Sequence, residues 1–143
     1  MSVYADTSFL VSLYPPDANS AQAASLMGAA PLPLMLTALG ELELMNALEL
    51  RRFRRELDSS EAGASRAAFR RDVENGIFVL KPLPANVFER AKLLARKRTF
   101  RLDIRSLDIL HLASALVLEA KAFYSFDRNQ CKLARKEGLQ TLP

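Results

Sequence analysis

The chain has 143 residues, of which half are hydrophobic and a quarter charged, a composition typical of one soluble globular domain over residues 1–143. Its single cysteine, Cys131, excludes an intrachain disulfide framework and is compatible with a reducing compartment, so we expect an inert core or surface thiol. No apolar run approaches the ~20 residues of a membrane helix, and residues 1–14 lack the basic segment of an export signal. We therefore expect a cytoplasmic protein that does not insert into membranes.

Short apolar segments alternate with helical patterns along the chain. Apolar runs of this length, bounded by turn or charged residues, are typical of strands covered on both faces. We predict strands at 3–5, 34–37, 77–80 and 122–125, with a weaker fifth at 139–141. Helices are predicted at 7–14, 19–30, 38–55, from 59 or 60 to 75, 84–97, 106–119 and 127–137. This alternation predicts an α/β fold with a parallel sheet of four to five strands, right-handed crossovers and about seven helices.

Prolines, glycines and apolar spacing set the expected helix limits. Pro15 and Pro16 stop the first helix, Pro84 suits the first turn of the fifth, and Gly76 and Gly138 follow the fourth and seventh. The segment 106–119 is apolar nearly all round, which places that helix inside the fold. In 38–55 the apolar residues near helical spacing are Leu39, Leu42, Leu50 and Phe53.

Charge is unevenly distributed. Residues 1–50 contain no Lys or Arg, so the remaining residues carry all 20 basic groups. A basic excess can attract phosphate backbones. The simpler interpretation, solvated helix faces, fits the charge pattern at least as well.

Four acids fall where acids are otherwise uncommon. Asp6 directly follows the first predicted strand, and Asp127 follows the fourth after one residue. Asp108 lies in the first turn of the apolar helix, and Glu43 lies inside the third helix. Ligands of open parallel sheets bind outside the carboxyl ends of the strands, so these carboxylates are candidates for one shared site.

Clustered carboxylates repel one another unless a cation is present. Mg²⁺ or Mn²⁺ suits such oxygen ligands, whereas the sequence has no His/Cys cluster for zinc. We expect the single histidine, His111, to be a core residue or a residue near the site rather than a metal ligand. The alternative is structural: Asp6, Asp127 and Ser106 are good N-cap candidates, and Asp108 would gain from the helix dipole. Glu43 caps nothing at mid-helix, although it could be a plain exposed residue.

Four segments in this order resemble the motifs of PIN-domain nucleases. Any one of the motifs is weak, whereas all four in order and spacing are specific, and Ser106 stands where Thr is common. The segments are YADTSFL at 4–10, LELMNAL at 42–48, RSLDILHLA at 105–113 and YSFDRNQ at 124–130. The compact length and the motif wording look most like the VapC-type toxins of toxin–antitoxin pairs.

The resemblance implies a PIN-like three-layer fold and an endoribonuclease that needs Mg²⁺ or Mn²⁺. By this analogy Asp6, Glu43 and Asp108 bind or orient the principal metal, and Asp127 completes the acidic site. Thr7 and Ser125 would be supporting hydroxyls, and Arg105 could steer phosphate or simply be a surface residue. The implied partners are the RNA substrate, a second copy of the chain and a cognate antitoxin.

Three other interpretations fit parts of the same pattern. A PIN nuclease of RNA processing, outside toxin–antitoxin systems, keeps the same site. Loss of one or more of the acids would favour a non-catalytic PIN-like binding module, but all four acids are present in this sequence. A phosphoacceptor receiver domain needs a paired acid after the first strand, where this chain has Thr7.

Overall fold

The computed structural model describes residues 1–143. Five parallel strands form one sheet in the order β3-β2-β1-β4-β5. They are β1 (Val3–Ala5), β2 (Leu34–Thr37), β3 (Phe78–Lys81), β4 (Ala122–Tyr124) and β5 (Gln140–Leu142). The chain builds the sheet outward from β1 through β2 to β3, then crosses to the other side of β1 for β4 and β5. The order therefore reverses between β1 and β4, and this is where open α/β sheets place their ligands.

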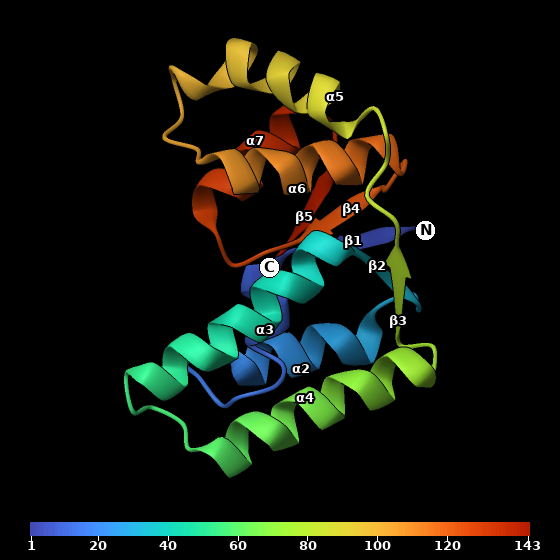
Figure 1. Cartoon of the computed structure of the whole chain (residues 1–143). Coiled ribbons are helices and arrows are strands. Elements are labelled where there is room, and N and C mark those ends of the chain that lie inside the picture. Colours follow the sequence, from blue (N-terminus) through green and yellow to red (C-terminus); the bar gives the residue numbers. More distant parts are fainter.

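Seven α-helices cover the sheet on both faces (Figure 1). One face of the sheet carries Tyr4, Met35 and Phe123 and packs on the helices of the C-terminal half. The other face carries Val3 and Ala5 and packs on the helices of the N-terminal half. The side chains alternate because successive strand residues point to opposite faces. The helices are α1 (Thr7–Val11), α2 (Ser20–Ala29), α3 (Ala38–Phe53), α4 (Ser59–Glu74), α5 (Val87–Leu94), α6 (Ser106–Val117) and α7 (Arg128–Lys136).

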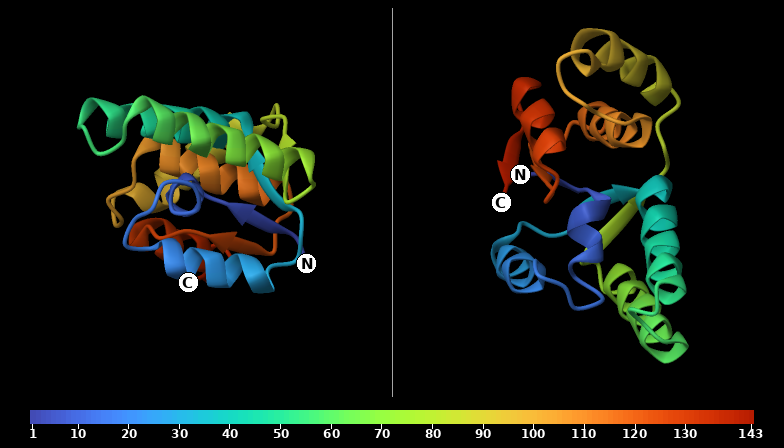
Figure 2. Two further views of the ribbon diagram at one scale, coloured as in Figure 1. Left: turned by 90° about the horizontal axis from the view of Figure 1, so that it is seen from below. Right: turned by 90° about the vertical axis from the view of Figure 1, so that its left-hand side faces the viewer.

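The result is the predicted three-layer α/β arrangement, seen from two more sides in Figure 2. The helix α6 is the most deeply buried, with every side chain from Ile109 to Ala115 buried. It lies between the sheet and α5, which agrees with its apolar sequence. No helix in the structure combines the length and the apolar character required to cross a bilayer.

Three predicted features differ from the structure. The first helix ends at Val11, three residues before Tyr14. The fifth starts at Val87, after a turn at 84–86, and continues as a π-helical segment (Ala95–Thr99). In α3 the apolar residues near helical spacing are not the buried ones: Gly40, Leu44 and Leu48 are buried, whereas Leu42 and Phe53 are 65% and 85% exposed.

Candidate active site

Asp6 lies at the point where the strand order reverses. It follows β1, its side chain is buried, and its backbone N–H donates to the carbonyl of Tyr124 at the end of β4 (3.0 Å). An extended backbone at Asp6 lets one carboxylate oxygen, Oδ2, cap α1 by accepting from the Ser8 N–H (3.2 Å). The same oxygen accepts from the hydroxyls of Ser8 (2.7 Å) and Ser125 (3.0 Å). The other oxygen, Oδ1, has no hydrogen-bond donor.

Two serines join the loops that follow β1 and β4. Their hydroxyls lie 3.0 Å apart, and the backbone N–H of Phe126 donates to Ser8 Oγ (2.9 Å) while that of Asp127 donates to Ser125 Oγ (3.0 Å). These bonds fix Asp127 relative to Asp6. Ser125 was predicted as a supporting hydroxyl; Ser8 was not, although its position two residues after a strand-end Asp is a usable signal.

Asp127 caps α7, as its sequence position suggested. Its Oδ1 accepts from the Gln130 N–H (2.9 Å), which leaves Oδ2 without a donor. The side-chain amide of Gln130 donates to the Asp108 carbonyl (3.4 Å). This contact ties the start of α6 to α7, so two of the four acids are linked through one buried glutamine.

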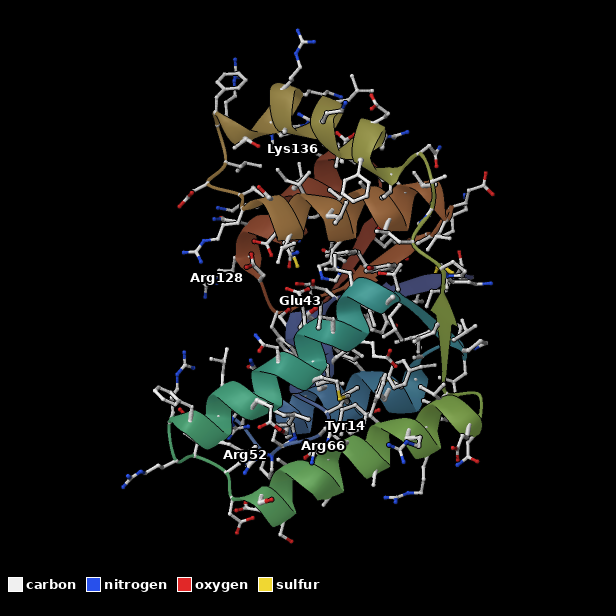
Figure 3. The ribbon with its side chains drawn as sticks, in the orientation of Figure 1. Tyr14, Glu43, Arg52, Arg66, Arg128 and Lys136 are labelled. Carbon is white, nitrogen blue, oxygen red and sulfur yellow. The ribbon has the colours of Figure 1, made fainter.

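Glu43 extends from α3 toward α6 (Figure 3). Its Oε1 accepts from Thr7 Oγ1 (2.8 Å) and is hydrogen-bonded to His111 Nε2. Burial opposes ionisation of Glu43, but the hydrogen bond and the charge of His111 lower its pKa. Glu43 is therefore held ionised by partners from two other elements, with Oε2 left free.

His111 is part of the site, which sequence reasoning left between core and near-site roles. Its Nδ1 lies 2.8 Å from the hydroxyl of Tyr4, on β1, and its Nε2 lies 4.0 Å from Asp6 Oδ1. Burial alone would lower the pKa of His111; the hydrogen bond to Glu43 and the nearby charges of Asp6 and Glu43 raise it instead. Burial also raises the pKa of Tyr4, so Tyr4 remains a neutral phenol.

Asp108 is in the first turn of α6 and makes no side-chain hydrogen bond. Burial raises its pKa first, and the charges of Asp127, Asp6 and Glu43 raise it further, against a smaller opposite effect of His111. The charges of the other three acids thus act on Asp108 at the carboxyl ends of the strands. No three of them are close enough to share an ion in this arrangement.

Two further predicted residues make no side-chain contact that places them in the site. Arg105, at the cap position of α6, is exposed, and its side chain makes no hydrogen bond or ion pair. Ser106 does not cap the helix, since it lies inside α6 and the cap position has no side-chain bond. Each acid retains a carboxylate oxygen that no protein donor occupies, and such oxygens suit a hard divalent cation that draws the side chains closer together.

A family model described as "PIN domain" matches residues 3–136. The chain belongs to the PIN domain family. Among curated proteins, no significant match to the sequence was found.

Solved structures share the fold of this PIN domain at low sequence identity. VapC20 of Mycobacterium tuberculosis, described as a toxin that cleaves the sarcin–ricin loop, superposes with a TM-score of 0.73 at 21% identity, covering 99% of this chain and 100% of that one. FitAcB from Neisseria gonorrhoeae gives 0.71 at 16% identity, with 99% and 96% covered. A toxin–antitoxin complex from Klebsiella pneumoniae gives 0.64 at 14% identity, with 92% and 90% covered. At these identities the likeness establishes the fold alone.

Proposed function

We propose that this PIN domain is a metal-dependent endoribonuclease that hydrolyses RNA phosphodiester bonds with Mg²⁺ or Mn²⁺. The observation that carries the proposal is the electrostatic coupling of Asp108 to Asp127, Asp6 and Glu43 at the sheet edge where the strand order reverses. Four separate loop and helix segments supply these acids. Repulsion among these carboxylates destabilises the fold, whereas a bound divalent cation would relieve the repulsion.

The protein's own residues would hold and orient the reacting groups. Asp6, Glu43, Asp108 and Asp127 would supply oxygen ligands, and a bound ion would lower the pKa of its water and offset the phosphate charge. Thr7 fixes Glu43, and Ser125 with Ser8 fixes Asp6, each through one carboxylate oxygen. The other oxygen of each carboxylate would then remain available to the metal, and holding a ligand in place is the usual role of such hydroxyls. Arg105, exposed and unpaired at the start of α6, is free to meet phosphate.

We also propose that the chain is the toxin of a VapBC-type pair in the cytoplasm, as a homodimer that binds a cognate antitoxin. The similarity of its fold to a toxin and to a toxin–antitoxin complex supports this assignment. A cavity of about 320 Å³ between the early helices would offer a groove for an antitoxin segment. Its lining is partly apolar (Val11, Ala47 and Leu50) and partly charged (Asp17, Arg51, Arg54 and Glu56). The exposed side chain of Phe53 lies at the end of α3, the helix that carries Ala47 and Leu50.

RNA cleavage by purified protein, with and without Mg²⁺ or Mn²⁺, tests the enzymatic proposal. Asp6→Asn should abolish cleavage while the fold persists, because Asn caps a helix about as well as Asp. Asp58→Asn is the matched control: Asp58 caps α4 in the same way but lies outside the site, so cleavage should be unchanged. Cleavage without metal, or by the Asp6 variant, would refute the proposal.

The toxin assignment has its own test. Co-expression with the product of an adjacent small gene should yield a complex in which cleavage is inhibited. A nuclease that cuts RNA but binds no such product would be an RNA-processing PIN enzyme instead. A chain that binds RNA and never cuts it would be a binding module.

A further inference from the structure

A second cavity adjoins the acidic site on the side of α7. It has a volume of about 430 Å³ and lies between the N-cap of α2, at Asn19, and one face of α7. Ser125, Arg128, Lys132 and Arg135 are among its lining residues. No acidic side chain lines the cavity, so the charge of its side chains is uniformly positive.

The three cations share one face of α7 because they are spaced by four and three residues. Arg128 and Lys132 form no ion pair, while Arg135 donates to Thr141 Oγ1 (2.7 Å). Some other basic residues of the chain are neutralised, such as Arg98 and Lys97, which pair with Glu137. A solvated helix face explains unpaired cations on a convex surface, but not their convergence on one cavity.

Arg128 also occupies a position that helix stability disfavours. It is the first residue of α7, where the helix dipole attracts anions and repels cations. In Figure 3 its side chain extends away from the ribbon, free of any protein partner. A cation that gains nothing from its own helix remains available for an external anion.

Ser125 connects this cavity to the acidic site. It lines the cavity, and its hydroxyl donates to Asp6 Oδ2 (3.0 Å). Arg128 directly follows Asp127 in the chain. An anion held here would therefore lie beside the acids, and the cations of α7 would balance its charge. A nucleic-acid strand, which carries several phosphates in a row, requires such separate positive charges beside an acidic site.

We propose that this cavity binds a backbone phosphate of the RNA strand next to the phosphate that is cut, with Arg128 and Lys132 as its main cations. The inference rests on the proposed ribonuclease function for the identity of the strand. The phosphate contact positions the strand without reading its sequence. An acidic peptide is the competing occupant, and RNA binding by a charge-removal variant separates the two.

The test is the binding of a single-stranded 2′-O-methyl oligoribonucleotide, which lacks the free 2′-hydroxyl, in EDTA to keep it intact. The variant carries Arg128→Ala and Lys132→Ala; the control carries Arg71→Ala and Lys121→Ala, which removes the same charge from α4 and from the amino end of β4. The site variant should bind about tenfold more weakly, and its log Kd against log salt slope should fall by about 0.7 for each phosphate that it no longer neutralises. The control should keep the parental slope.

Cleavage assays separate this inference from the proposed function. With a long RNA the site variant should show a raised KM and an unchanged kcat, because the acids are intact.

Equal losses of RNA binding in both double variants would mean that general electrostatic attraction explains the binding, and this result would overturn the inference. Parental RNA binding by the site variant would overturn it as well and would favour the acidic peptide. If no protein cleaves RNA, the proposed function fails, while the binding comparison still decides whether the cavity takes phosphate. Arg128→Lys with Lys132→Arg should restore binding, since it restores both charges.

Discussion

Asp108→Asn should stabilise the metal-free protein, although it removes a favourable helix-dipole charge. The pKa of Asp108 is raised by burial and by the charges of Asp127, Asp6 and Glu43, so the folded state resists its ionisation. One pKa unit corresponds to about 1.4 kcal/mol, and Asp108 is partly exposed, so screening reduces this gain. The lost dipole interaction costs about 0.3–1 kcal/mol. We expect the relief of burial and repulsion to exceed this loss, so that the Tm rises by at most a few degrees for a domain of this size.

Glu89→Gln provides the matched control. Glu89 also lies in a first helical turn, that of α5, but it faces solvent and pairs only with Lys92 (2.6 Å). Its variant loses the same kind of dipole interaction without relieving any repulsion, so it should melt slightly below the parent. Thermal denaturation in EDTA at pH 7 measures both shifts.

The pH dependence of the Asp108 effect has a definite sign. A carboxyl whose pKa is raised on folding destabilises the fold above that folded pKa, where it must ionise. The penalty disappears as the pH falls below the unfolded value of about 3.9. The Tm advantage of Asp108→Asn should therefore be largest near pH 7 and shrink toward pH 4.

Saturating Mg²⁺ or Mn²⁺ should reverse the order of melting. An ion at about 100 times its Kd stabilises the parent by about 2.7 kcal/mol, and the variant has lost one of the ligands that would bind it. RNA cleavage should fall by orders of magnitude in the same variant. A variant that melts below the parent in EDTA, gains as much from metal and cuts RNA normally would refute the reasoning, because Asp108 would then serve only its helix.

Three further predictions concern stability and are measured by urea or thermal denaturation. Tyr4→Phe should cost about 1–3 kcal/mol, because it leaves the buried Nδ1 of His111 without the hydroxyl 2.8 Å away. Leu48→Ala should cost about 2–4 kcal/mol, whereas Leu42→Ala on the same helix should stay within about 0.5 kcal/mol; equal effects would contradict the observed core face of α3. Burial raises the pKa of Glu137, but Arg98 and Lys97 lower it overall, so Glu137→Gln should destabilise the fold at pH 7 by about 1 kcal/mol and lose its effect as the pH falls below about 4.

The sequence predicted the strands to within one residue, because the first four are short apolar runs of the kind that is covered on both faces. In α3 the apolar residues near helical spacing do not coincide with the buried side, because spacing alone does not show which neighbouring element packs against the helix. Gly40 is buried on that face, and a Cβ there would contact Leu36 at 3.6 Å and His111 at 3.7 Å. Gly40, Leu44 and Leu48, spaced four residues apart, therefore form the side of α3 that meets the sheet.

The four acids could be selected from the sequence, but the groups that orient them could not. Tyr4 and His111 lie 107 positions apart in sequence, and Ser8 and Ser125 lie 117 apart. The serine contact exists because β1 and β4 are neighbours in the sheet, and the tyrosine–histidine contact exists because α6 packs on the face of the sheet that carries Tyr4. The sequence marks a strand-end acid, whereas the topology determines which hydroxyl or imidazole stands beside it.

The choice between helix capping and a role in the site, which the sequence leaves open for Asp6 and Asp127, is not exclusive. Each carboxylate caps its helix with one oxygen, Oδ2 of Asp6 and Oδ1 of Asp127, and keeps the other free of donors. Asp58 caps α4 by the same geometry, yet it is exposed and lies at no reversal of strand order. Capping alone therefore does not distinguish a site residue from a purely structural one. It does have a mechanical consequence, because the helix N-terminus holds the carboxylate in one orientation and the free oxygen then points in a fixed direction. In this fold the cap is the means by which a strand-end acid is aimed at the site.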